Sequence, residues 1–195
     1  MAVSLEVATD HFFNPRNVGD ADEPSFVGRA ASLICGGHVR FSIQVDEEQV
    51  LSQAKFKATG CSVLVASTSM LTERVVNIPT AEAAIIGQNP DELASNFAEL
   101  EPGREHCPKI ACEALLAAIR EYSDAARDEW IGEEALICTC FFVSEQTIEQ
   151  EIATRGLTTV AEVTRACNAG GGCGSCHQLI QEILDIGRTD ILVCR

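Results

Sequence analysis

Apolar and polar residues alternate along the segment VRFSIQV, residues 39–45. A shorter apolar segment, residues 54–58, follows after an acidic turn at residues 46–48. Alternation with a period of two is typical of a β-strand that has one buried face. We therefore expect an antiparallel, half-buried hairpin in this part of the chain.

The periodicity changes after Gly60, where apolar side chains recur near the spacing of an α-helix. The residues near that spacing are Val63, Leu64, Ala66, Met70, Leu71 and Val75. Further helices are expected near Thr80, at Asn89-Pro90 and after Pro108, because caps and proline mark helix starts. A sheet followed by helices predicts an α+β fold, in which helices pack on a small antiparallel sheet.

A second, smaller module is expected toward the C-terminal end of the chain. Ser144 is placed to cap one helix there, and Thr159 with Glu162 forms a capping box for the next. We therefore predict two domains, residues 1–130 and a small all-α domain at residues 135–190. The second domain is small enough to depend on a bound metal for its stability.

The composition is that of a folded chain, because 46% of its 195 residues are hydrophobic. The formal net charge of −15 argues against nucleic acid as a partner. No stretch of about 18 uncharged apolar residues occurs, so we expect no membrane association. The first ten residues lack the features of a secretory signal, so we expect a cytoplasmic protein whose ten cysteines stay reduced.

Four cysteines form two close pairs, a CxC pair at Cys138 and Cys140 and a CxxC pair at Cys173 and Cys176. Four thiolates from two short loops can surround a metal ion or a two-iron cluster. The glycines of residues 169–176 let the backbone approach inorganic sulfide and donate N–H groups to it. Structural zinc also accepts four cysteines, so the pattern leaves iron-sulfur and zinc open.

Three further cysteines stand singly in the first two thirds of the chain. Cys35 precedes two glycines in a turn, while Cys61 and Cys107 are expected at helix starts, where thiolates are stabilised. Together with His106 they could converge on one open metal site. The alternative is structural, since a lone cysteine in an apolar helix is usually a small core residue.

The CxC pair and the later AGGGCGSCH run resemble the bacterioferritin-associated ferredoxin type of [2Fe-2S] domain. This resemblance implies a permanent [2Fe-2S] cluster with four ligands, Cys138, Cys140, Cys173 and Cys176. It leaves Cys167 and His177 outside the ligand set, as structural or solvent-facing residues.

Four motifs in the first part of the chain resemble, in order, the NifU and IscU scaffold family across about residues 5–125. They are HFFNPRNVG at residues 11–19, Cys35-Gly36, FKATGC at residues 56–61 and His106-Cys107. With the ferredoxin-like module, the chain is similar to NifU without its last domain.

The resemblance implies a non-enzymatic function in which a transient [2Fe-2S] cluster is assembled and passed to apo iron-sulfur acceptor proteins. Its ligands would be Cys35, Cys61 and Cys107, with an accessory role for His106, and a cysteine desulfurase would supply sulfur. A homodimer is one alternative for the oligomeric state.

One position departs from the family pattern, because Gly37 stands where the family usually has an aspartate. We hypothesise that this chain holds or releases its cluster differently, with His106, or alternatively His38, completing the coordination.

Two other functions fit parts of the sequence. In the first, the chain is a ferredoxin-like electron-transfer protein whose N-terminal domain only docks partners. In the second, it is a zinc-stabilised interaction protein. A thiol enzyme is disfavoured, because the sequence has neither a nucleophile elbow nor a dinucleotide fingerprint.

Overall fold

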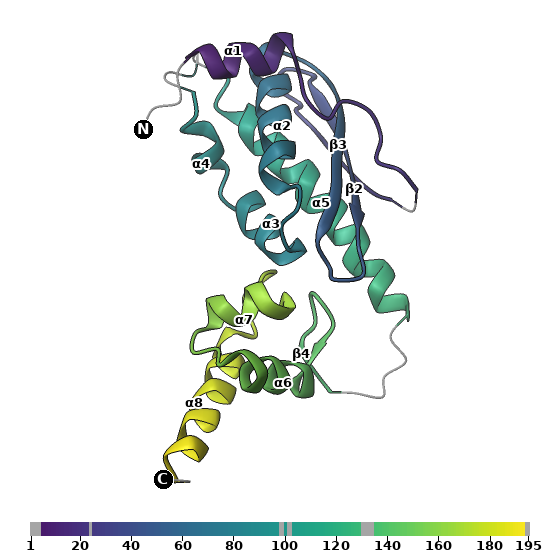
Figure 1. Ribbon diagram of the computed structural model, residues 1–195. Helices are drawn as coiled ribbons and strands as arrows, with labels where there is room; N and C mark the ends of the chain where they lie inside the picture. The colour runs from purple at the N-terminus through teal and green to yellow at the C-terminus, as the bar shows by residue number, and fades with distance from the viewer. Residues whose placement is uncertain (1–4, 24, 98–99, 101–102, 130–134, 194–195) are drawn as a thin grey trace. The chain divides into compact units, whose positions relative to one another are not determined.

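The computed structural model describes residues 5–23, 25–97, 100, 103–129 and 135–193 (Figure 1). The chain forms two compact units. Their residues are Met1–Ile78 with Ala83–Tyr122 for the first unit, and Pro79–Glu82 with Ser123–Arg195 for the second. The expected gap between two domains, residues 131–134, lies outside the described residues, so the exact domain limits stay a prediction.

The first unit contains an antiparallel sheet of three strands in the order β1-β2-β3. Its strands are β1 (Phe26–Ala31), β2 (His38–Val45) and β3 (Leu51–Thr59). The predicted hairpin is confirmed as β2 and β3, and its register places Phe41 opposite Phe56. One face of the sheet is buried and carries Val39, Phe41, Ile43, Ala54 and Phe56. The alternation in the sequence therefore identified the core-facing side of this sheet.

Both edges of the sheet are engaged by other parts of the first unit. Beside β3, the Gly19 N–H donates to the Phe56 carbonyl at 2.8 Å, which forms a short parallel bridge. Beside β1, the Val27 N–H donates to the Glu121 carboxylate. The rings of Phe26 and Tyr122 pack edge to face next to this contact, with centroids 5.2 Å apart.

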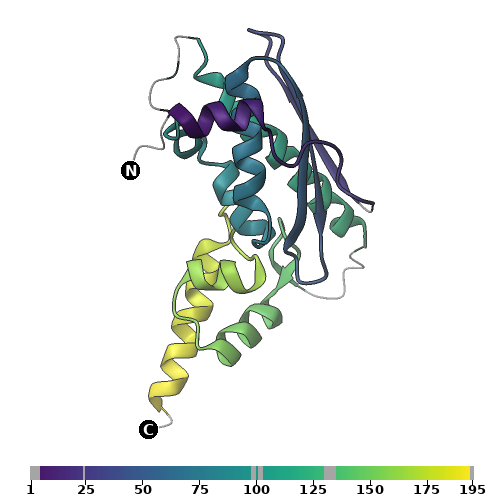
Figure 2. The ribbon, with the colours of Figure 1, turned by 45° about the horizontal axis from the view of Figure 1, so that its top comes forward.

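Five helices accompany the sheet: α1 (Leu5–Phe13), α2 (Ser62–Val75), α3 (Thr80–Gly87), α4 (Pro90–Ala94) and α5 (His106–Glu129). Figure 2 shows α2 running close to β3. Helix α5 approaches β1 so closely at Gly28 that a Cβ atom there would lie 2.0 Å from the Ala114 carbonyl oxygen. Glycine is therefore required where this helix crosses the sheet.

Helix α1 is attached to α2 largely by polar contacts. The buried His11 places its Nδ1 2.9 Å from Oγ of Ser69, and the same oxygen accepts the Arg16 N–H at 2.9 Å. Arg16 also pairs with Asp10, and the Glu73 carboxylate lies 3.5 Å from Nε2 of His11. The HFFNPRN motif thus fixes the N-terminal helix on the body of the unit.

The second unit is mainly helical, as predicted, with α6 (Glu145–Arg155), α7 (Val160–Cys167) and α8 (His177–Val193). The Ser144 side chain accepts the Thr147 N–H, and the predicted capping box of Thr159 and Glu162 is present at the start of α7. A short hairpin, β4 (Leu136–Cys138) with β5 (Val143–Ser144), precedes these helices and was not expected.

No helix in the described part of the chain combines the length and the apolar character that crossing a membrane requires.

Candidate metal centres

Three segments that are distant in the sequence bring the singly placed cysteines together. Cys35 lies between β1 and β2, Cys61 is the N-cap residue of α2, and His106 and Cys107 begin α5. The Cys35 Sγ lies 3.1 Å from Nε2 of His106, and the Cys61 Sγ lies 3.4 Å from the Cys107 Sγ. The Cys107 Sγ also lies 3.8 Å from the same His106 nitrogen, so the two pairs are adjacent. These four residues therefore form one cluster of side chains, which we call the N-terminal site.

A tight turn presents Cys35. The Ser32 N–H donates to the Gly37 carbonyl at 2.8 Å, and the Gly36 N–H donates to the Ser32 carbonyl at 2.9 Å. Gly36 has a φ of +70°, a region that glycine enters at no steric cost. The Ser32 hydroxyl oxygen also accepts the N–H groups of Ile34 and Cys35. The turn leaves Cys35 exposed, as its glycines predicted.

The three thiols of the N-terminal site differ in exposure and acidity. Cys35 is exposed, Cys61 is half-buried and Cys107 is fully buried. Hydrogen bonds to Ser32 and His106 lower the pKa of Cys35 to about 7. Burial and the neighbouring Cys61 thiol raise the pKa of Cys107 to about 12. The thiol that solvent reaches most easily is thus also the one that ionises near neutral pH.

Gly37 lies between Cys35 and the first turn of α2. A Cβ atom on Gly37 would lie 2.9 Å from Cδ2 of Leu64 and 3.4 Å from the Cys35 Sγ. A side chain at this position would therefore point into the N-terminal site. Of the two histidines considered above, His106 contacts the thiols, whereas His38 places its Nε2 2.8 Å from the Thr59 hydroxyl.

The donors of the N-terminal site are arranged in pairs. Each iron of a [2Fe-2S] cluster takes two protein ligands, and two thiolates bound tetrahedrally at about 2.3 Å lie roughly 3.7 Å apart. The separations of 3.1 and 3.4 Å within the pairs, and of 3.8 Å between them, are thus of the size expected for donors that share bound iron.

A second group of thiols, which we call the C-terminal site, lies between the β4–β5 hairpin and the start of α8. The Cys140 Sγ lies 3.4 Å from the Cys173 Sγ. Burial and the nearby Cys138 thiol raise the pKa of Cys176 to about 12. Hydrogen bonds from Ser175 lower the pKa of the exposed Cys173 to about 7. All four predicted cysteines are therefore close together here.

The glycines of the C-terminal site let the backbone pack closely around the thiols. A Cβ atom on Gly172 would lie 2.6 Å from Cβ and 2.8 Å from Sγ of Cys140. Gly170 and Gly174 have φ values of +89° and +74°, which turn the backbone around the thiols. Four cysteines at this spacing match a [2Fe-2S] cluster, and they also match structural zinc.

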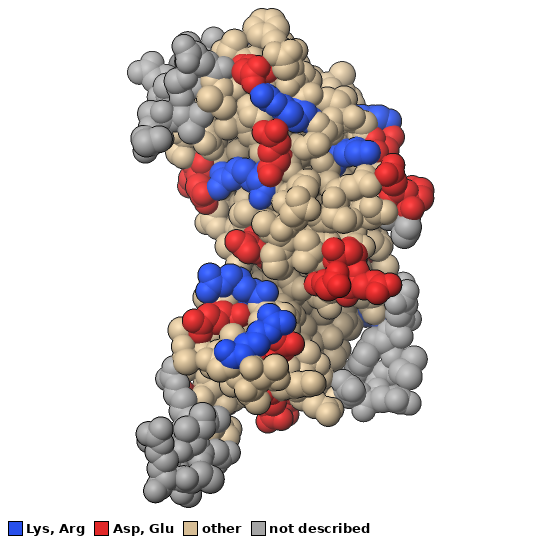
Figure 3. Space-filling view, viewed as in Figure 1, with Lys and Arg blue, Asp and Glu red and all other residues tan. Residues whose placement is uncertain are grey.

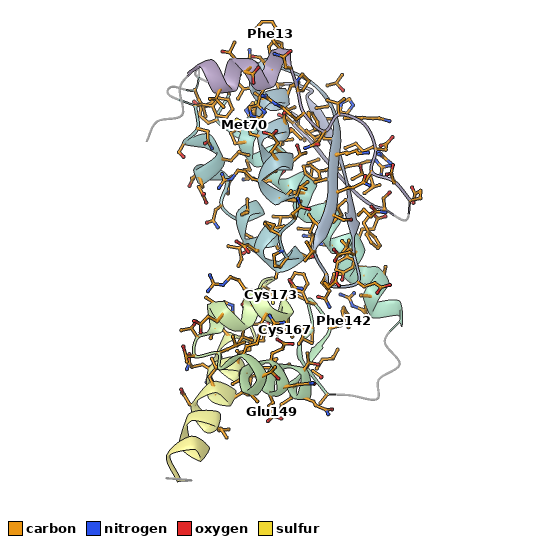
Figure 4. All side chains as sticks on the ribbon, viewed as in Figure 1. Phe13, Met70, Phe142, Glu149, Cys167 and Cys173 are labelled. Carbon is orange, nitrogen blue, oxygen red and sulfur yellow. The ribbon has the colours of Figure 1, made fainter. Side chains whose placement is uncertain are left out.

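The two neighbouring residues that the sequence left outside the ligand set are engaged locally. Nε2 of His177 lies 2.7 Å from the Gly170 carbonyl oxygen. The Cys167 thiol donates to the Val163 carbonyl within α7 at 3.3 Å, and burial raises its pKa. Figure 4 shows Cys167 and Cys173 in the second unit.

Three polar side chains act on the thiols of the two sites, and no motif predicts them. Ser32 is one of them. Arg104 is another, and it acts on Cys61. Burial raises the pKa of Cys61, but hydrogen bonds to its sulfur, including one from Arg104, outweigh burial, so the pKa of Cys61 is lowered. The third is Ser175, whose hydroxyl lies 3.0 Å from the Cys173 Sγ. Single serines and arginines carry no motif, so only the folded geometry reveals them.

Both parts of the chain match described protein families. Residues 4–128 match the NifU-like N terminal domain, and residues 136–186 match the BFD-like [2Fe-2S] binding domain.

The chain is also similar to named proteins and to a solved structure. The nitrogen fixation protein NifU of Azospirillum brasilense is 35% identical over 179 residues, which cover 90% of this chain and 57% of that protein. The iron-sulfur cluster assembly scaffold protein IscU of Azotobacter vinelandii is 38% identical over 125 residues, covering 63% and 94%.

A crystal structure of the N-terminal part of a NifU-like protein from Brucella abortus has the same fold. Its TM-score is 0.50 at 17% identity, and the match covers 63% of this chain and 95% of that one. The chain thus spans little more than half the length of the NifU protein it matches, and almost the full length of the IscU protein.

Proposed function

Because the chain belongs to the NifU-like N-terminal domain family and continues into a BFD-like [2Fe-2S] binding domain, we propose that it is a scaffold and carrier for iron-sulfur clusters. Its N-terminal site would assemble a transient [2Fe-2S] cluster as cargo. It would then pass this cluster to apo iron-sulfur proteins. The C-terminal site would keep a permanent [2Fe-2S] centre.

The convergence of Cys35, Cys61, His106 and Cys107 carries this proposal. These residues come from three separate segments, yet their donor atoms pair at 3.1 and 3.4 Å. We assign one iron of the cargo to Cys35 with His106, and the other to Cys61 with Cys107. Because Cys35 is exposed and Cys107 is buried, sulfur and iron enter, and the finished cluster leaves, on the Cys35 side.

The permanent centre would be held by Cys138, Cys140, Cys173 and Cys176. A [2Fe-2S] cluster supplies one-electron redox chemistry when bound. Around it, Ser175 donates hydrogen bonds to Cys173, and the absence of a side chain on Gly172 leaves room for Cys140. The Cys173 side of this site faces solvent, which is where an electron-transfer partner would approach.

The partners that follow from this function are a cysteine desulfurase, which supplies sulfur, and apo iron-sulfur acceptor proteins. We assign the protein to the cytoplasm, with no nucleic acid or membrane partner. A homodimer is compatible with this function. The chain acts in this scheme as a scaffold and carrier, not as an enzyme.

The proposal is tested by comparing Cys35→Ala with Cys112→Ala. Cys112 is buried in the same helix as Cys107, so it controls for loss of a thiol outside the N-terminal site. Each variant is loaded without oxygen with ferrous iron, cysteine, a desulfurase and a thiol reductant, which supplies the electrons that convert persulfide sulfur to sulfide, and transfer to an apo-ferredoxin is followed by absorbance. We expect Cys35→Ala to slow transfer by at least about tenfold, with the permanent chromophore intact. Cys112→Ala should transfer normally.

The match to the BFD-like domain also supports a second candidate, an electron-transfer protein whose first domain only docks partners. Unchanged transfer by Cys35→Ala, with a redox-active chromophore, would favour this candidate. Anoxically purified protein that is colourless and holds only zinc would contradict both, because zinc sites do not absorb visible light.

A further inference from the structure

The outer face of the three-stranded sheet carries a row of basic side chains. Strand register places Arg29 of β1 opposite Arg40 of β2, and Arg40 opposite Lys57 of β3. Directly paired residues point to the same face of a sheet, and neighbouring strands lie about 4.8 Å apart. Three positive charges therefore stand side by side in a chain whose net charge is −15.

This row borders a cavity of about 540 Å³ on the outer face. Ala31, which pairs with His38 on this face, is among the residues that line it, and the hydrogen-bonded pair His38 and Thr59 stands at the end opposite the row. Concave sites of this size with a few polar groups at their rim are typical of small-molecule binding. The cavity lies within the first unit, outside the N-terminal site.

The chain segment after α1 lies against the outer face of the sheet next to the basic row. Ala21 is buried, and its N–H donates to the Ser42 hydroxyl at 2.9 Å, which holds this segment against the outer face. The segment places Asp20 at the row, where one carboxylate oxygen contacts Arg40 and the other contacts Lys57. The protein's own carboxylate thus demonstrates how an oxyanion is bound between two of these cations.

Arg29 differs from its two neighbours in the row. It is exposed, and among the described residues no carboxylate forms an ion pair with it. On the face shown in Figure 3, by contrast, basic side chains lie close to acidic ones. Only one guanidinium nitrogen of Arg40 is engaged by Asp20, so Arg40 retains donors for a second anion.

We propose that this cavity binds a small multivalent oxyanion, with Arg29 and Arg40 as its charged contacts and the His38–Thr59 pair as polar contacts at the far end. Two planar guanidinium groups in adjacent strands suit carboxylate and phosphate oxygens, which they can contact in pairs. The ligand is thus a polycarboxylate or a phosphate compound of small-molecule size. This site is independent of the assembly of iron-sulfur clusters.

The test measures binding of citrate and pyrophosphate to the full chain by titration calorimetry. We expect Arg29→Ala to raise the Kd of the preferred anion by about threefold to fivefold, the range for an exposed charge contact. Asp20→Asn should lower the Kd by about twofold to threefold, because it removes a competing carboxylate. Arg165→Ala, which removes an equally exposed positive charge in the second unit, should leave the Kd unchanged.

Comparison of the two probes distinguishes a polycarboxylate from a phosphate ligand, and either preference supports the site. If Arg29→Ala and Arg165→Ala raised the Kd of the anion equally, the change would be explained by net charge alone, and the proposal would be overturned. An unchanged Kd in Asp20→Asn would overturn the proposal as well. The proposal would also be overturned if neither citrate nor pyrophosphate bound at low salt. This holds even if a glutamate-rich peptide bound the same face. Because no cluster is needed for this measurement, its outcome does not depend on the transfer experiment with Cys35→Ala.

Discussion

The two cysteine sites are similar in the acidity of their thiols and different in how the backbone supports them. Each site has one exposed thiol with a pKa of about 7, Cys35 or Cys173. Each also has one buried thiol with a pKa of about 12, Cys107 or Cys176. Exposure and acidity of the thiols therefore do not distinguish the site that we propose to pass its cluster on from the site that we propose to keep one.

The two sites differ in their ligand atoms and in the chain segments that carry them. The N-terminal site combines three thiols with His106 and takes them from three segments separated by loops. The C-terminal site has four thiols from a hairpin and one glycine-rich turn, with Gly172 packed against Cys140. A neutral imidazole leaves less negative charge on a bound cluster than a fourth thiolate does. On the proposed function, we infer that the ligand set and the backbone packing decide which site keeps its cluster.

The largest expected effect comes from Gly172→Ala. The added Cβ would lie 2.6 Å from Cβ of Cys140, so this ligand has to move. We expect the iron content and the visible absorbance of the C-terminal site to fall about tenfold, while cargo transfer from the N-terminal site continues. Gly156→Ala is a stringent control, because its added Cβ meets no heavy atom within 4 Å although the φ of +64° at the α6 cap makes the substitution strained. Full iron content in Gly172→Ala would show that close packing does not define this site.

A smaller effect is expected from Gly37→Asp, which restores the carboxylate that the family usually has. Its side chain would start 3.4 Å from the Cys35 Sγ and offer the cargo an additional anionic ligand. We expect cluster transfer to an apo-ferredoxin to slow by about threefold to tenfold. Gly37→Ala separates this effect from steric contact with Leu64, which a Cβ alone would cause at 2.9 Å. Equal transfer rates in all three proteins would contradict our hypothesis that Gly37 changes cluster release.

The smallest effect concerns Cys35 in the metal-free protein. Since its pKa is lowered to about 7, its thiolate fraction and its rate of alkylation by iodoacetamide should rise steeply as pH increases through 7. The Ser32 hydroxyl is the largest cause of this shift. Ser32→Ala should therefore move the midpoint upward, toward the ordinary thiol pKa of about 8.5. Mass spectrometry of the alkylated peptide measures this midpoint, and a midpoint unaffected by Ser32→Ala would assign the low pKa to another cause.

The sequence predicted those parts of the fold whose signals are local. The alternation in residues 39–45 identified a strand, and the Thr159–Glu162 pair identified a cap that the structure contains. The β4–β5 hairpin was not expected, because β5 has two residues and such a length leaves no periodicity. From the residues alone, convergence of Cys35 and His106 was one of two alternatives, and the resemblance favoured it, because 71 residues separate the two. Contacts of this separation depend on the packing of whole elements, which no short pattern encodes.

The contact between Val27 and Glu121 has a consequence for the behaviour of the protein in concentrated solution. Strand β1 forms the edge of its sheet, and free backbone donors on such an edge can recruit strands from other molecules. By accepting the Val27 N–H, the Glu121 carboxylate removes one of these donors and places a negative charge where an incoming strand would have to lie. Replacing Glu121 would thus favour intermolecular strand addition, and with it aggregation.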